Sequence, residues 1–317
     1  MFKLDQQLFP NTFSRVSSFN AIPVREDILF VNAKGEEKAG IRKAAQKRLS
    51  QVGAPLKKLL SPDEIVLFTA RAQMPMSGLE QYSLGCFAQI VGLVTLVLTN
   101  KRLIAFRVNR DGSWRGNVRS CAYGDIKETK FVGFLTHFAM LKYADGTKEK
   151  YWGIDRTTKK MLRLLLPTLM QASSQETTAT KATVSLCPAC NAQLRSRNYE
   201  CQSCGQKFRD ESPLPWRILI PGGVYFYARQ NGMGLVHALI DAIFMLETLA
   251  LLVVFTTSSG TQRQNAAITL AYWAVLLLIE KAIAFAHAKK FLREFIPIAD
   301  TSRAAMPGIS AAAAAGR

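Results

Sequence analysis

Two long apolar stretches near the C-terminal end constrain the fold of this chain more than any other feature. Residues 235–255 and 267–286 are apolar with few interruptions. At 1.5 Å of rise per residue, about 20 helical residues match a hydrocarbon core about 30 Å thick. Neither stretch has the wide polar face of an amphipathic helix, which argues against the alternative of two buried helices in a soluble bundle. We therefore predict a hairpin of two transmembrane helices, over residues 235–256 and 267–287.

The distribution of basic residues predicts the orientation of this hairpin. The chain has 41 Lys and Arg against 23 Asp and Glu, a formal net charge of +18, and most of the excess precedes the hairpin. Basic residues also flank the two open ends of the hairpin: Arg217, Arg229, Lys289, Lys290 and Arg293. The positive-inside rule then places both termini in the cytoplasm, as in a multi-pass protein of the bacterial inner membrane. Residues 211–234 are expected to run along the membrane interface before the first span.

Ionisable residues interrupt both predicted spans: His237, Asp241, Glu247, Glu280 and Lys281. Such groups are costly at membrane depth and usually face a partner or a wet cavity. Counted back from the outer loop, Asp241 and Lys281 lie at similar depth, which predicts an ion pair between the helices. Glu247 lies on another face of the first helix and has no assigned partner. Two interpretations stay open, namely a packing or homo-oligomer contact and a proton or ion path.

Four of the six cysteines form two Cys-x-x-Cys pairs: Cys187, Cys190, Cys201 and Cys204. Four thiolates at this spacing can converge tetrahedrally on one Zn²⁺, and Gly205 permits the tight turn after the second pair. The pattern resembles the short zinc ribbons of many bacterial membrane and regulatory proteins, which carry CPxC and CxxCG knuckles. We predict a structural Zn²⁺ site in a ribbon over residues 185–210.

Other chemistry remains open for these cysteines. A redox dithiol at Cys187 and Cys190 would require a βαβ unit around the motif, and an iron-sulfur or other metal site would use the same four thiols. Reduced thiols agree with a cytoplasmic location. Cys86 and Cys121 stand alone and are expected to be small buried side chains.

Turn motifs alternate with β-rich runs over residues 61–172. Asp111-Gly112 links a strand at 103–108 to one at 119–123 through a long loop, and Asp145-Gly146 joins 137–143 to 147–153. The apolar run 84–98 is too short for a membrane span and favours sheet. A helix capped by Asp155 should follow, kinked or shortened by Pro167. Its apolar stripe consists of Met161, Leu162, Leu165, Leu166 and Leu169.

The segment Val97-Leu98-Thr99-Asn100-Lys101-Arg102-Leu103-Ile104, with Tyr123-Gly124-Asp125-Ile126-Lys127 after it, resembles a signature of bacterial pleckstrin-homology-like (PH-like) domains, also seen in GRAM domains. The resemblance implies a bent β-barrel of seven strands with a capping helix, and a binding rather than a catalytic role. Basic residues around the first hairpin are candidates for contact with a phospholipid head group or a partner, or else for a solvated edge: Lys101, Arg102, Arg107, Arg110 and Arg115.

The remaining segments complete a multi-domain α+β organisation. Residues 1–60 form a basic N-terminal region, in which 36–52 favours a helix with Ile41, Ala45, Leu49 and Val52 on one side. Arg48 intrudes on that side, which favours a surface helix over one lying on the anionic leaflet. A linker is expected at 173–184 and a flexible tail at 300–317.

These parts predict a membrane-anchored cytoplasmic adaptor or binding protein that contacts anionic lipid or a protein partner. The motifs of common hydrolases and nucleotide-binding enzymes are absent from the sequence, and it has three histidines, so we expect no enzyme. The first alternative is a membrane component of transport or envelope-stress sensing that uses the intramembrane acids. The second is membrane-tethered nucleic-acid binding, which the few basic residues around the ribbon support poorly.

Overall fold

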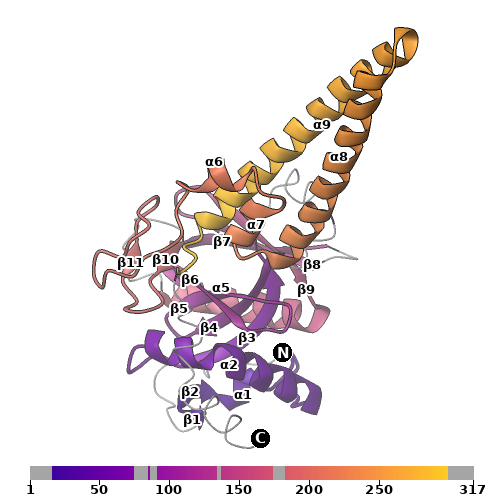
Figure 1. Cartoon of the computed structure of the whole chain (residues 1–317). Helices are drawn as coiled ribbons and strands as arrows, with labels where there is room; N and C mark the ends of the chain where they lie inside the picture. The colour runs from indigo at the N-terminus through magenta and orange to yellow at the C-terminus, as the bar shows by residue number, and fades with distance from the viewer. Residues whose placement is uncertain (1–15, 75–84, 86–90, 134–136, 174–182, 299–317) are drawn as a thin grey trace, which may run out of the picture. The chain divides into compact units, whose positions relative to one another are not determined.

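The computed structural model describes residues 16–74, 85, 91–133, 137–173 and 183–298 (Figure 1). The chain divides into two compact units. The first is Met1–Gln206 with Ala299–Arg317, and the second is Lys207–Ile298. The first unit is a mixed α+β structure built on a large antiparallel sheet, and the second is helical.

Two antiparallel meanders form the sheet of the first unit. The first meander has four strands: β3 (Val66–Gln73), β4 (Leu93–Thr99), β5 (Arg102–Val108) and β6 (Trp114–Ala122). The second has three: β7 (Ile126–Val132), β8 (His137–Tyr143) and β9 (Lys148–Ile154). A short 3₁₀ turn, η3 (Tyr123–Asp125), connects them, and β3 pairs with β9 at Gln73 and Trp152.

A C-terminal helix, α5 (Arg156–Ser173), packs into the main core of this sheet. The Asp155 carboxylate accepts the amide of Thr158 at 2.8 Å, so the predicted helix cap is confirmed. The predicted apolar stripe is buried in the core. Pro167 does not shorten the helix, which runs six residues further. One lost backbone hydrogen bond is tolerated there because Leu165, Leu166 and Leu169 stay buried on either side of the proline.

The hairpin at Asp111-Gly112 is tighter than the sequence indicated. β6 begins at Trp114, and the Gly112 amide donates to the carbonyl of Asn109 at 3.0 Å. Gly112 has a φ of +91°, which explains the glycine at this turn. The buried Trp114 donates its indole N–H to the carbonyl of Asn117 and so fixes the early start of the strand.

The N-terminal segment extends the sheet and covers its other face. β1 (Val16–Phe19) and β2 (Ile22–Arg25) form an antiparallel hairpin, and β2 pairs in parallel with β3 at Val24 and Val66. α1 (Glu26–Leu29) follows β2, and α2 (Ala39–Leu59) packs over that face. The apolar side predicted for α2 is buried at Ala45, Leu49 and Val52, and the helix extends beyond the predicted end. Arg48 is tolerated there because its guanidinium donates to the carbonyl of Thr69 at 3.0 Å. With both faces covered, β4 is buried at every residue from Val94 to Thr99 rather than at every second one.

Four helices form the second unit: α6 (Leu214–Arg217), α7 (Gly223–Tyr227), α8 (Asn231–Thr257) and α9 (Gly260–Leu292). α8 and α9 lie side by side as a long hairpin (Figure 1). Both helices are longer than the predicted spans, and the predicted outer loop is largely taken up by the start of α9. Both are long and apolar enough to cross a membrane. In the most apolar 18-residue stretch of each helix, 6% of the residues are buried inside the protein. Core helices of a soluble bundle would be mostly buried.

Candidate metal centre

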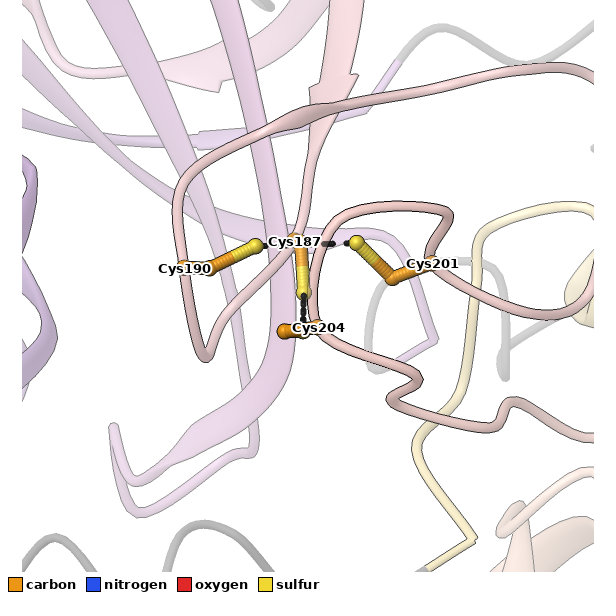
Figure 2. A group of neighbouring side chains, drawn as sticks. All are labelled: Cys187, Cys190, Cys201 and Cys204. Carbon is orange, nitrogen blue, oxygen red and sulfur yellow. Dashed lines mark hydrogen bonds between the residues drawn. The ribbon is translucent and has the colours of Figure 1, made fainter.

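The four cysteines predicted as metal ligands lie together in the first unit. Their sulfur atoms are all within 4.8 Å of one another. The Sγ atoms of Cys187 and Cys204 are 3.6 Å apart, as are those of Cys190 and Cys201 (Figure 2). All four are free thiols, so the cluster is not a pair of disulfides. Tetrahedral coordination with bonds of about 2.3 Å would separate sulfurs by about 3.8 Å. The cluster could therefore hold one four-coordinate metal ion.

The two Cys-x-x-Cys loops have the same backbone structure. In the first, the Asn191 amide donates to the carbonyl of Cys187, and in the second the Gly205 amide donates to the carbonyl of Cys201. Asn191 and Gly205 both have left-handed φ values, of +63° and +70°. The sequence indicated this role for Gly205 alone. After glycine, Asn adopts this conformation most readily. The Asn directly after Cys190 could therefore have predicted the same turn in the first loop.

Backbone amides in both loops point at sulfur. Burial raises the pKa of Cys187 to about 12, against the effect of the Cys190 and Ala189 amides that donate to its sulfur. Burial also opposes ionisation of Cys201, but amides from Ser203 and Cys204 lower its pKa to about 7. Amides aimed at the sulfurs stabilise thiolates, the form in which cysteine binds metal.

The strands on either side of the first Cys-x-x-Cys loop belong to the sheet. β10 (Val184–Leu186) pairs with β11 (Gln193–Leu194) inside the ribbon and, on its other side, with β6. In that second pairing Val184 lies opposite Ser120 and Leu186 opposite Val118. The Asn191 side chain also donates to the carbonyl of Lys58 at the end of α2. Spacing alone predicted the ribbon but gave no indication that its first strand extends the sheet.

The basic residues proposed for head-group contact do not gather into one open patch. Lys101 pairs with Asp63 at 2.6 Å, and Arg115 donates to Asn109. Arg102 forms two 2.9 Å hydrogen bonds to Glu64, and Arg107 is 6% exposed, with its Nε 3.0 Å from the sulfur of Met74. Arg110 is exposed at the hairpin turn. Head-group contact by these residues stays a prediction, and the burial of Arg107 argues against its participation.

The buried carboxylate of Glu64 should make the stability of this region depend on pH. It is fully buried and accepts hydrogen bonds from Arg102 and Thr99. Burial would raise the pKa of Glu64, but the bonds from Arg102 outweigh it and the pKa is lowered. The carboxylate therefore stabilises the fold above its ordinary pKa of 4.5, and this stabilisation is lost as the pH falls below it.

We expect Glu64→Gln to remove that acid-dependent component and to lower stability at pH 7 by about 1–3 kcal/mol, because Arg102 loses its charged partner. The measurement is the thermal unfolding midpoint of the detergent-purified chain between pH 7 and pH 3. Glu37→Gln, which removes an exposed partner of Arg42, serves as the control and should change little. Equal pH dependence in wild type and Glu64→Gln would refute the assignment.

In the second unit, the predicted ion pair between α8 and α9 is confirmed. The Lys281 Nζ lies 2.6 Å from Asp241 Oδ1 and 3.3 Å from Glu280. Asp241 is 3% exposed, and its other oxygen accepts the backbone amide of Gly222 at 3.0 Å. Glu247 is exposed, and no described cation pairs with it.

The sequence did not indicate the rest of this polar cluster. His237 Nδ1 lies 2.7 Å from Glu280, and its ring stacks on Tyr225 at 4.3 Å. The Tyr225 hydroxyl lies 3.1 Å from a ring nitrogen of the buried His287. Glu280 and His287 are two helical turns apart on one face of α9. This spacing is the feature of the sequence that could have predicted a shared polar cluster. The short α7 is thereby attached to both long helices.

A close approach of backbones holds α7 in place. Gly222 has a φ of +62°, and a Cβ there would lie 2.0 Å from the carbonyl oxygen of Gly234. Only glycine fits this position, because the obstacle is backbone and cannot rotate away.

Function must be inferred from these sites themselves. Comparisons of the chain with protein-family models, with curated proteins and with solved structures found no match.

Proposed function

We propose that this protein is a membrane-anchored cytoplasmic adaptor, in which a PH-like domain and a structural zinc ribbon hold anionic lipid or a protein partner at the membrane. The observation that carries the proposal is the pairing of β10 with β6. It joins the candidate metal loops and the β-domain into one folded body. A metal site with four thiol ligands has no open position for a substrate, which suits a structural role.

The order of elements in the first unit supports a PH-like domain. The resemblance implied seven strands closed by a helix, and β3 to β9 followed by α5 have that order. Two meanders meet at one edge and the helix fills the core between them. Such an arrangement leaves strand edges and loops available for binding.

The second unit supports the anchor. α8 and α9 are long and apolar, and large side chains such as Leu246 and Leu278 are 68% and 69% exposed. So much exposed apolar surface is rare in soluble monomers and is stable inside a bilayer. Lys289 and Lys290 in the last turn of α9 are consistent with a cytoplasmic end.

The orientation can be tested with cysteine labelling in intact cells. Ser259 lies at the tip of the hairpin, immediately before α9, and Arg293 immediately follows the other end of that helix. We expect a membrane-impermeant maleimide to label Ser259→Cys from outside, whereas Arg293→Cys should react after lysis alone, above the labelling of the unsubstituted protein. Labelling of Arg293→Cys in intact cells would contradict a cytoplasmic C-terminus.

The adaptor function itself requires a captured partner. A photocrosslinking amino acid at the exposed Arg110, in the full-length protein in its membrane, should give a discrete adduct with a protein or an anionic lipid. The matched control carries the same group at Lys34, an exposed position between α1 and α2. If position 110 gives no adduct beyond that control in metal-loaded, inserted protein, the β5–β6 side of the domain is not the binding face.

A further inference from the structure

The free edge of the sheet beside α5 has the features of a peptide-binding site. Of the described strands, β8 alone pairs with β7, so β7 ends the sheet. α5 packs along the same strand. Between them lies a cavity of about 450 Å³, within the size range of ligand sites. Its lining residues are Thr129, Lys130, Phe131, Val132, Arg163 and Pro167.

The open edge of β7 favours an extended chain as the occupant. An edge strand presents backbone N–H and C=O groups that another strand can pair with. The cavity is lined by neighbouring residues of β7, whose side chains point to opposite faces of the sheet, so it lies at the edge itself. Pro167 has no N–H to give to the carbonyl of Arg163, four residues before it, and both residues line the cavity. A lipid head group could accept hydrogen bonds from single amides, but it could not pair with alternating N–H and C=O groups along a strand.

The charges around the cavity favour an acidic occupant. Lys130 and Arg163 stand on opposite walls and are both exposed. No described carboxylate pairs with Arg163, whose planar guanidinium suits two-point binding of a carboxylate. Lys130 has a 2.9 Å ion pair with Glu128, but both side chains are about half exposed. Such surface pairs are weak and can be exchanged for a better partner. Val132, 50% exposed, adds an apolar contact.

We propose that the cavity between β7 and α5 binds an extended acidic segment of a protein partner, which adds as a strand to the edge of β7. This inference rests on the proposed adaptor function and names the chemistry of its partner. Carboxylates of the segment contact Lys130 and Arg163, and apolar side chains on the two faces of the added strand contact Phe131 and Val132, which point to opposite faces of the sheet. Pairing along β7 would give affinity, and the two cations would give selectivity.

The test uses the full-length protein in detergent and a panel of fluorescent peptides in which Glu and Val occur in different orders, so that either residue can lie on either face of the added strand. The controls are the same peptides with Lys in place of Glu, and vesicles of anionic lipid. We expect saturable binding of the Glu peptides alone. Lys130→Glu combined with Arg163→Glu should raise the dissociation constant by at least about tenfold. Lys148→Glu combined with Lys160→Glu makes the same charge change at exposed positions outside the cavity and should have little effect.

Hydrogen exchange separates strand addition from simple charge attraction. Bound peptide should slow the exchange of β7 amides and leave β5 amides unchanged. The proposal is overturned by absence of peptide binding, by equal loss in both charge-reversal pairs, or by anionic vesicles that protect β7 as the peptide does. If any of these occurs while the Arg110 crosslink persists, the adaptor function survives and this site alone is rejected.

Discussion

Replacing Cys187 by Ser is expected to abolish metal binding and to release the ribbon from the sheet. Cys187 is fully buried, and its sulfur is 3.6 Å from that of Cys204. A hydroxyl is a poor replacement for a thiolate ligand, and structural Zn²⁺ contributes about 10–16 kcal/mol of apparent binding energy in small zinc domains at pH 7. β10 and β11 have three and two residues, too few to stay ordered by their own packing.

Metal content by mass spectrometry and hydrogen exchange check this prediction together. Wild type should hold one Zn²⁺ per chain and Cys187→Ser about none. The amides of β6 at residues 118–120, which lie opposite β10, should exchange faster in the variant. Cys121→Ala is the matched control, because Cys121 is a buried thiol outside the cluster. Iron in the wild-type protein, or a disulfide between Cys187 and Cys190, would disprove a structural zinc site.

Local patterns in the sequence were sufficient to predict the features that depend on residues close together in the chain. The spacing of the four cysteines identified the cluster that the structure brings together. The apolar stripe and the Asp155 cap identified α5, because both follow from the helical period. Counting residues back from the outer loop matched Asp241 with Lys281, since two antiparallel helices of equal rise keep equal depth.

Features that depend on pairing between distant segments could not be predicted in this way. β10 joins β6 across about sixty residues of sequence, and nothing in a three-residue strand specifies that edge. Arg102 was read as a head-group candidate, but its side chain is bound to Glu64, 38 residues earlier. A basic residue in a strand-turn sequence has the same local pattern in both roles. The buried carboxylate that distinguishes the roles is visible only in the fold.

The assignment of His237 shows the same limit of local reasoning within the hairpin. His237 and Asp241 are four residues apart, so helical spacing puts them on one face of α8. In the structure each of them finds its partner on α9 instead, His237 at Glu280 and Asp241 at Lys281. Contacts between the helices depend on how α8 and α9 are rotated about their axes. The apolar pattern does not fix this rotation, because apolar residues are spread around most of both helices.

The second large effect is expected from the buried ion pair of the hairpin. Asp241→Leu leaves the Lys281 ammonium without its closest partner and removes the acceptor of the Gly222 amide. Breaking a buried pair from one side costs about 3–5 kcal/mol. Glu280, 3.3 Å from Lys281, remains as a second carboxylate, so the loss should fall at the lower end of this range. Thermal unfolding in detergent measures it, and Glu247→Gln, at an exposed acid of the same helix, is the control.

Two double variants show which interaction matters. Asp241→Leu with Lys281→Leu removes both charges and should recover most of the stability, because no buried charge is left unpaired. Exchange of the two residues, Asp241→Lys with Lys281→Asp, keeps the pair but places an ammonium beside the Gly222 amide, where an acceptor is needed. It also brings an aspartate next to Glu280 in sequence. The exchanged variant should therefore remain less stable than the double leucine variant. The reverse order would mean that the charge pair alone, and not its link to the backbone of Gly222, stabilises the base of the hairpin.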